Sequence, residues 1–151
     1  MFRKIASFTI MLIFISVAFL THGNAADRYE MANLYPDLWA ASSGQDLDEV
    51  KRLVAKGADV NRRDASGSTA LLHAAMAGNQ GIVKFLISKG AEINIKERSM
   101  GLSPISAAAA NGHESVVKLL IEMGATDIDG AISAAKQFGH EEIEALLNAK
   151  K

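Results

Sequence analysis

The chain has 151 residues, of which 22% are charged and 49% hydrophobic, so it holds enough material for one domain. It carries 16 basic and 17 acidic residues, and this near balance lacks the positive excess typical of nucleic-acid-binding domains. Cysteine is absent, which excludes disulfides, thiolate metal sites and a lipid-modified cysteine from this sequence.

The first 25 residues have the composition of a secretory signal peptide. Arg3 and Lys4 supply the positive start, and residues 10–20 are apolar apart from one serine. Small residues precede the expected cleavage point after Ala25. The apolar run reaches at most 16 residues, whereas a transmembrane helix needs ~20. An uncleaved N-terminal membrane anchor is therefore the alternative to cleavage.

Removal of this segment would leave 14 basic and 17 acidic residues. A signal peptide without any cysteine favours a bacterial periplasmic protein, because small extracellular domains usually depend on disulfides. Secretion and N-terminal membrane anchoring are the alternative locations. We expect no nucleic-acid partner, and no membrane contact once the signal is cleaved.

A polar lead-in over residues 26–36 precedes four pairs of short helical segments. Pro36 is expected to mark the start of the first helix, where proline is tolerated. The middle pairs each begin with a polar loop, whereas the first and last pairs lack one. The approximate boundaries of the four pairs are 37–63, 64–96, 97–126 and 127–151.

The pairs repeat one another at a fixed spacing. Gly44, Gly78 and Gly112 are separated by 34 residues each time, and paired alanines keep the same offset. A period of about 33 residues made of a turn and two helices indicates a repeat stack, in which each unit buries its apolar face against its neighbours.

These motifs are similar to those of the ankyrin-repeat family. Residues 57–61, Gly-Ala-Asp-Val-Asn, match the family's closing run unaltered. Residues 69–75 follow its Thr-Pro-Leu-His-x-Ala-Ala pattern in part, and Gly112 with His113 matches its Gly-His turn. The resemblance implies an all-α repeat solenoid over residues 37–151, with about four helix-turn-helix repeats joined by short β-hairpin-like loops.

Departures from the family pattern fall on the loops. Leu72 and Ser106 replace the histidine of the family motif, and Arg98 replaces the aspartate that opens a repeat. The second loop, residues 95–100, is one residue longer than the first, residues 62–66. We therefore expect the second loop to protrude further.

The resemblance also implies a protein-binding surface, on the hairpin tips and the exposed side of the first helix of each pair. The matching positions are Trp39, Ser42, Ser43, Arg62, Arg63, Ala65, Ser66, Ser68, Met76, Ala77, Arg98, Ser99, Met100, Leu102, Ala110 and Asn111. Met76, Met100 and Leu102 are apolar residues with no core position to fill, which favours contact with a partner. The alternative is that they cover neighbouring loops.

The sequence contains no recognisable catalytic or metal-binding motif. His113 and His140 follow turn glycines and His73 lies in a first helix, so the repeat accounts for their positions. No second histidine completes a His-Glu-x-x-His zinc motif, and no nucleophile elbow or phosphate-binding glycine loop occurs. We expect neither a metal nor a cofactor, and no enzymatic activity.

The sequence therefore predicts a monomeric, non-catalytic adaptor that binds another protein through its tips and a concave helical groove. One alternative in the same class is an inhibitor or protective partner of a periplasmic enzyme. An alternative of a different class is a small hydrolase that acts through His73 or His113.

Overall fold

The computed structural model describes the backbone of residues 25–151 and the side chains of residues 33–151. The predicted signal peptide lies outside the described residues, apart from Ala25. The chain divides into two units, residues 1–33 and 34–151, and the second unit holds all the predicted repeats.

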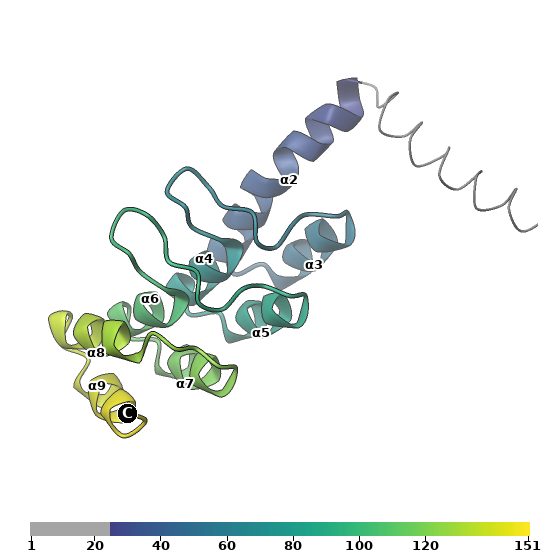
Figure 1. Ribbon diagram of the computed structural model, residues 1–151. Helices are drawn as coiled ribbons and strands as arrows, with labels where there is room; N and C mark the ends of the chain where they lie inside the picture. The colour runs from purple at the N-terminus through teal and green to yellow at the C-terminus, as the bar shows by residue number, and fades with distance from the viewer. Residues whose placement is uncertain (1–24) are drawn as a thin grey trace, which may run out of the picture. The chain divides into compact units, whose positions relative to one another are not determined.

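The described residues form eight helices and no strand. The helices are α2 (Ala25–Ser43), α3 (Leu47–Ala55), α4 (Ala70–Ala77), α5 (Gln80–Ser88), α6 (Pro104–Ala110), α7 (Glu114–Glu122), α8 (Ile128–Gln137) and α9 (Glu141–Asn148). Helices α4, α6 and α8 pack side by side in one row, and α3, α5, α7 and α9 form a second row (Figure 1). The all-α repeat stack predicted from the sequence is confirmed.

The start of the first helix differs from the prediction. Pro36 was expected to begin it, but α2 passes through Pro36 and begins at Ala25. Residues 26–35 contain no glycine or proline and several strong helix formers, so the helix continues upstream. Proline removes one hydrogen bond from the helix interior without ending it here. The predicted lead-in is therefore helical.

Short helices in the stack depend on capping. Thr69, Asn79 and Ser103 each accept a hydrogen bond from the backbone N–H three residues later, at the starts of α4, α5 and α6. Pro104 follows Ser103 at the first position of α6, where its missing N–H costs nothing. These caps supply partners for backbone groups that helices of this length could not satisfy internally.

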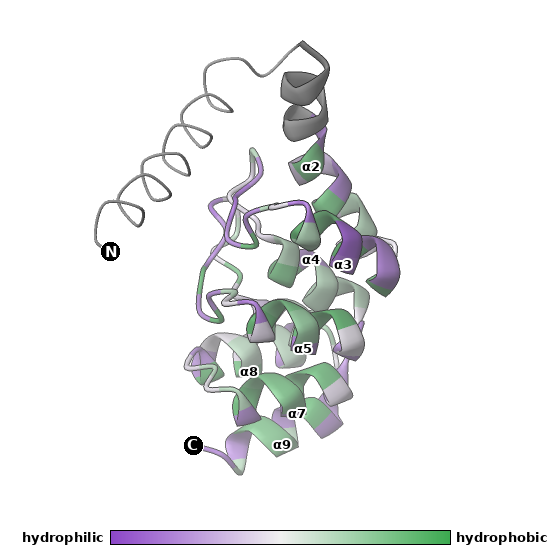
Figure 2. Cartoon of the chain, turned by 90° about the vertical axis from the view of Figure 1, so that its right-hand side faces the viewer, coloured by the Kyte–Doolittle hydropathy of each residue, from purple (hydrophilic) through white to green (hydrophobic). Residues whose placement is uncertain are grey.

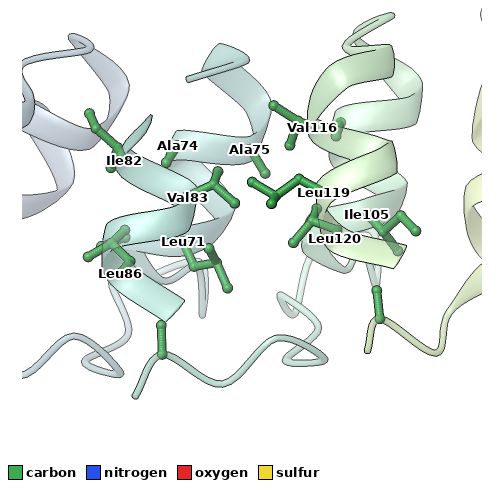
Figure 3. Close-up of a cluster of buried hydrophobic side chains, with 14 of the residues drawn as sticks. Leu71, Ala74, Ala75, Ile82, Val83, Leu86, Ile105, Val116, Leu119 and Leu120 are labelled. Atoms are coloured by element: carbon green, nitrogen blue, oxygen red, sulfur yellow. The ribbon is translucent and has the colours of Figure 1, made fainter. Parts of the chain in front are cut away.

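A single apolar core runs through the stack. Leu53, Leu86, Leu120 and Leu147 occupy equivalent positions in the four second helices, and none is more than 1% exposed. The first helices contribute fully buried alanines, such as Ala74 and Ala75 of α4, which allow close helix packing (Figure 3). In Figure 2, α5 and α7 are largely hydrophobic, whereas α3 and parts of the loops are hydrophilic. Each repeat therefore shares its core with its neighbours.

Truncation of one of these four leucines should destabilise the whole stack. Leu86 is 0% exposed, and replacing a buried leucine by alanine removes apolar contacts and leaves a cavity. Leu86→Ala is expected to lower the free energy of unfolding by ~2–5 kcal/mol, measured by urea denaturation. Lys84→Ala, on the exposed side of the same helix, is the control and should change it by no more than about 0.5 kcal/mol. An unchanged midpoint for Leu86→Ala would remove Leu86 from the core.

Candidate protein-binding surface

Two loops project from the same side of the stack, before α4 and before α6 (Figure 1). We define the first tip as residues 62–68 and the second tip as residues 95–102. A backbone hydrogen bond closes each tip. In the first tip the N–H of Asp64 donates to the carbonyl of Ser68 (2.9 Å), and in the second tip the N–H of Glu97 donates to the carbonyl of Leu102 (3.0 Å). Because no strand forms in the described residues, the tips are turns and not paired β-hairpins.

A carboxylate organises the first tip from within. Asp64 Oδ1 accepts hydrogen bonds from the backbone N–H groups of Ser66 and Ser68, both at 2.9 Å. Its second oxygen lies 2.9 Å from Nε2 of His73 in α4. The tip is thereby tied to the first helix that follows it.

Glu97 performs the same task in the second tip. Its Oε1 accepts from the N–H groups of Met100 (2.7 Å) and Leu102 (3.1 Å), and its Oε2 accepts from the N–H of Ser99 (2.6 Å) and from the Ser99 hydroxyl. Only 6% of Glu97 is exposed. The prediction that Arg98 replaces the repeat-opening aspartate is therefore wrong. Glutamate holds that position, because its additional methylene group spans a loop that is one residue longer.

Hydrogen bonding controls the ionisation of both carboxylates. The Ser99 hydroxyl and the backbone N–H groups of the second tip lower the pKa of Glu97 from 4.5 to about 2, against the opposing effect of burial. Burial would raise the pKa of Asp64, but hydrogen bonds from Ser66, His73 and Ser68 outweigh it and lower that pKa. Both carboxylates are therefore charged acceptors at neutral pH.

The tips are also joined to each other. The backbone N–H of Arg98 donates to the carbonyl of Ser66 at 2.9 Å. The Arg98 side chain covers Gly67, where an added Cβ would lie 2.8 Å from Arg98 Cγ and where φ is +84°. Glycine is thus required at this position for two reasons, and the two tips form one packed ridge.

Asparagine side chains tie the base of each loop to the next repeat. Asn61 Nδ2 donates to the carbonyl of Gly90 (3.0 Å), and Asn61 Oδ1 accepts from the N–H of Glu92 (2.8 Å). Asn94 makes the equivalent pair of bonds one repeat later, to Gly124 and Thr126. This explains the terminal asparagine of the Gly-Ala-Asp-Val-Asn run, and it limits movement of the loops.

Most of the predicted binding residues are accessible. The exposed ones are Ser43, Arg62, Arg63, Ala65, Ser66, Met76, Arg98, Ser99, Met100 and Asn111, and the half-buried ones are Trp39, Ala77, Leu102 and Ala110. Met76 is 41% and Met100 74% exposed, so these methionines do not fill the core. The structure brings the two groups of tip residues together on one ridge.

Two predicted binding residues are buried. Ser42 is 0% exposed, and its hydroxyl donates to the carbonyl of Leu38 one turn earlier in α2 (2.7 Å). Ser68 is 6% exposed, and its hydroxyl lies 2.8 Å from that of Ser66. Both serines satisfy polar groups inside the fold, so the expectation that they lie on the accessible surface is wrong.

The C-terminal part of α2 supports the first tip. The indole N–H of Trp39 donates to the carbonyl of Arg62 at 3.3 Å. The Arg62 guanidinium lies 5.2 Å from the centroid of the Tyr35 ring, within the range of a cation–π interaction. Tyr35 was not among the predicted residues, because the lead-in was not expected to be helical.

Phe138 is a further accessible residue that the prediction missed. It is 59% exposed and directly precedes the turn glycine Gly139. Ser43, Ala77 and Asn111 precede the corresponding glycines of the earlier repeats, and all three were predicted to bind. The repeat register would have identified Phe138, but the predicted surface was not extended to the last repeat.

Beside the first tip lies an open hollow of 710 Å³. Its lining consists of Arg63 and residues 91–96, with the half-buried Ile93 and Ile95 as the larger apolar groups. Of the predicted binding residues, Arg63 alone contributes to this lining. The hollow thus places two isoleucines and a cation in one open, mixed polar and apolar lining.

The histidines at the turns have structural partners. His113 Nε2 lies 2.9 Å from the carbonyl of Met76, and His140 Nε2 lies 3.1 Å from that of Ala110, each in the preceding repeat. The His113 ring covers Gly78, where a Cβ would lie only 2.6 Å from Nδ1. No cluster of three potential metal ligands occurs in the part of the chain that the structure describes.

The geometry around His73 does not favour hydrolysis. Its contact is with Asp64, whose other oxygen accepts from the Ser66 hydroxyl at 2.6 Å. A catalytic triad needs the imidazole between the hydroxyl and the carboxylate, so that it can take the proton from the nucleophile. Here the carboxylate occupies the central place, and Ser66 is not activated by His73.

A stack of helix pairs with joined tips along one side defines a repeat protein of the α-solenoid class. Residues 37–130 match the family model described as ankyrin repeats (3 copies). The chain belongs to the ankyrin-repeat family. None of the helices in the described region is both long and apolar enough to cross a bilayer.

Known relatives share the repeats but are much longer. The chain is 35% identical over 110 residues to the ankyrin repeat and KH domain-containing protein mask-1 of Caenorhabditis elegans, covering 70% of this chain and 4% of that protein. It is 33% identical over 107 residues to an ankyrin repeat protein of Rickettsia felis, covering 68% of this chain and 28% of the relative. It is 34% identical over 70 residues to protein fem-1 homolog A-like of Mus musculus, covering 46% of this chain and 10% of that protein.

The family assignment indicates the general type of activity. Ankyrin repeats are generally protein-interaction modules, and family members are generally non-catalytic. The chain spans less than a third of each of these relatives, so it shares their repeat domain and not their full length. Protein binding is accordingly the activity that the fold supports.

Removal of the charge on Glu97 should weaken the second tip. In Glu97→Gln the amide NH₂ would face the N–H and hydroxyl of Ser99, which need an acceptor. The free energy of unfolding at pH 7 is expected to fall by about 1–3 kcal/mol, measured by urea denaturation. Glu92→Gln, at an exposed carboxylate that makes no side-chain hydrogen bond in the described region, is the control and should be close to wild type.

The effect of this substitution should depend on pH. The pKa of Glu97 is depressed from 4.5 to about 2 in the folded state, so its contribution to stability is complete above the unfolded value and is lost as pH falls through the folded value. The stability difference between wild type and Glu97→Gln should therefore shrink between about pH 5 and pH 2. A constant difference over that range would show that the charge on Glu97 does not stabilise the tip.

Proposed function

We propose that this chain is an exported, non-catalytic adaptor that binds another protein through its two tips and the neighbouring exposed side of the first helices. The observation that carries the proposal is the exposure of Met76 and Met100, at 41% and 74%, beside tips whose own polar groups are already satisfied. Exposed apolar side chains on a well-ordered ridge favour a protein partner.

The internal hydrogen bonds of the tips support binding without rearrangement. Asp64 and Glu97 hold their loops from within, and the bond from Arg98 to Ser66 joins them. A surface that is already ordered loses little conformational entropy when a partner binds. A small stack of this kind can thus bind a partner through few residues.

Export to the periplasm is the second part of the proposal. It is supported by the positively charged start and apolar stretch of residues 1–25 and by the absence of cysteine. The chain recovered from its host with a C-terminal tag should have the mass of a product that begins at Ala26. A mass that retains residues 1–25 in the membrane fraction would indicate the N-terminal anchor, and one that retains them in the cytoplasm would contradict export.

Affinity capture from envelope extract tests the binding function. The tagged wild-type chain should retain a specific protein, and Met100→Asp should retain at least about tenfold less of it, because a charge replaces an apolar contact. Met123→Asp is the matched control, since Met123 is exposed (38%) but follows the second helix α7.

The capture experiment has two opposing outcomes. Retention by the wild type and Met123→Asp, with loss by Met100→Asp, would support the tip surface. Equal retention by all three chains, or by none, would contradict it. If the captured protein is an enzyme whose activity changes when the purified chain is added, the adaptor acts as its inhibitor or protective partner.

A further inference from the structure

On the two tips, the negatively charged side chains face inward and the positively charged ones are exposed. Asp64 and Glu97 turn inward and accept backbone N–H groups. Arg62, Arg63 and Arg98 are exposed, and none forms an ion pair within the described residues. The ridge is therefore positive on its outer side, although the whole chain has a net charge of −1.

Two of these arginines are held in place by neighbouring groups. The Arg62 guanidinium lies over the Tyr35 ring at 5.2 Å. The aliphatic part of Arg98 packs on Gly67. A guanidinium whose stem is already ordered loses less conformational freedom when it binds a carboxylate, and its planar donors match the two carboxylate oxygens.

Arg63 lies at the edge of the open hollow beside the first tip. Ile93 and Ile95 supply the larger apolar groups of that hollow, and Lys96, which also lines it, is paired with Asp127 at 2.9 Å. Glu92 is the one acidic residue of the lining. A ligand at this position would thus meet an available guanidinium next to apolar surface.

We propose that the tip surface, defined as Arg62, Arg63, Arg98 and Met100, binds an acidic segment of the partner protein. This inference rests on the proposed function and specifies the chemistry of the partner. Aspartate or glutamate side chains of the segment pair with the three guanidinium groups, and an apolar side chain of the segment enters the hollow beside Arg63. Met100 provides a second apolar contact.

The charge balance favours an acidic protein over a nucleic acid. Nucleic-acid binding draws its affinity from many phosphate contacts over a broad basic surface. Here the exposed arginines that form no ion pair within the described residues all lie on the tips, and the apolar groups beside them have no counterpart in a phosphate backbone. The mixture of cations and apolar groups suits a peptide in which acidic and apolar residues alternate.

Direct binding measurements test the inference. The probe is a short fluorescent peptide in which glutamate and leucine alternate, and the peptide with glutamine in place of glutamate is its control. The tagged chain, as the host processes it, should bind the acidic peptide at least about tenfold more tightly than the glutamine peptide, and the preference should decrease as salt is raised.

Charge reversal locates the binding on the tips. Arg63→Glu with Arg98→Glu should weaken acidic-peptide binding by about tenfold or more. The matched control is Lys84→Glu with Lys136→Glu, which makes the same change in net charge at exposed positions on α5 and α8. Urea midpoints establish that each variant is folded. Arg63→Glu alone serves as the second variant, since Arg63 donates no hydrogen bond within the described residues.

The outcomes separate this inference from the proposed function. Loss of binding in the arginine variants alone would support the acidic-segment proposal. Equal binding by the arginine and lysine variants, no preference for the acidic peptide, or tighter binding to anionic phospholipid vesicles or single-stranded DNA would overturn it. If the wild-type chain still captures a protein and loses it in Met100→Asp, the adaptor function survives that failure.

Discussion

A carboxylate at the opening of each loop, half-buried at Asp64 and buried at Glu97, is the group on which the rest of the surface depends. Asp64 and Glu97 accept hydrogen bonds from backbone N–H groups that would otherwise be unpaired in tight turns. These bonds take the place of the hydrogen bonds between paired strands, which the loops do not form. Asp127 precedes α8 and differs from these two carboxylates, because it accepts from the hydroxyls of Ser103 and Ser106 and from the ammonium group of Lys96. Burial would raise the pKa of Asp127, but its contacts with Lys96 and these hydroxyls lower it.

This use of acidic residues determines the character of the exposed surface. Asp64 and Glu97 turn toward backbone N–H groups, and neither forms an ion pair with an arginine of the tips. The arginines of the tips are therefore left for solvent or for a partner. The same hydrogen bonds that stabilise the loops thus produce a positive, ordered ridge on a chain whose net charge is slightly negative.

Stacking supplies the remaining order. Asn61 and Asn94 connect the base of one loop to the following repeat, while His113 and His140 connect the turns at the other end of the helices. Between these polar connections, the equivalent leucines of the second helices and the buried alanines of the first helices form one core. A single helix pair could not bury these side chains by itself. The family places protein interaction on such a framework, and the particular tip residues decide which partner is suitable.

The sequence by itself determined the repeat and the all-α stack, because a fixed period and recurring glycines and alanines specify local geometry directly. It also located the tips and most of their accessible residues. Only the tertiary structure decided that Glu97 replaces the aspartate and that Ser42 and Ser68 are buried. Each of these depends on which groups meet across turns and between repeats. Residue spacing along the chain does not contain that information.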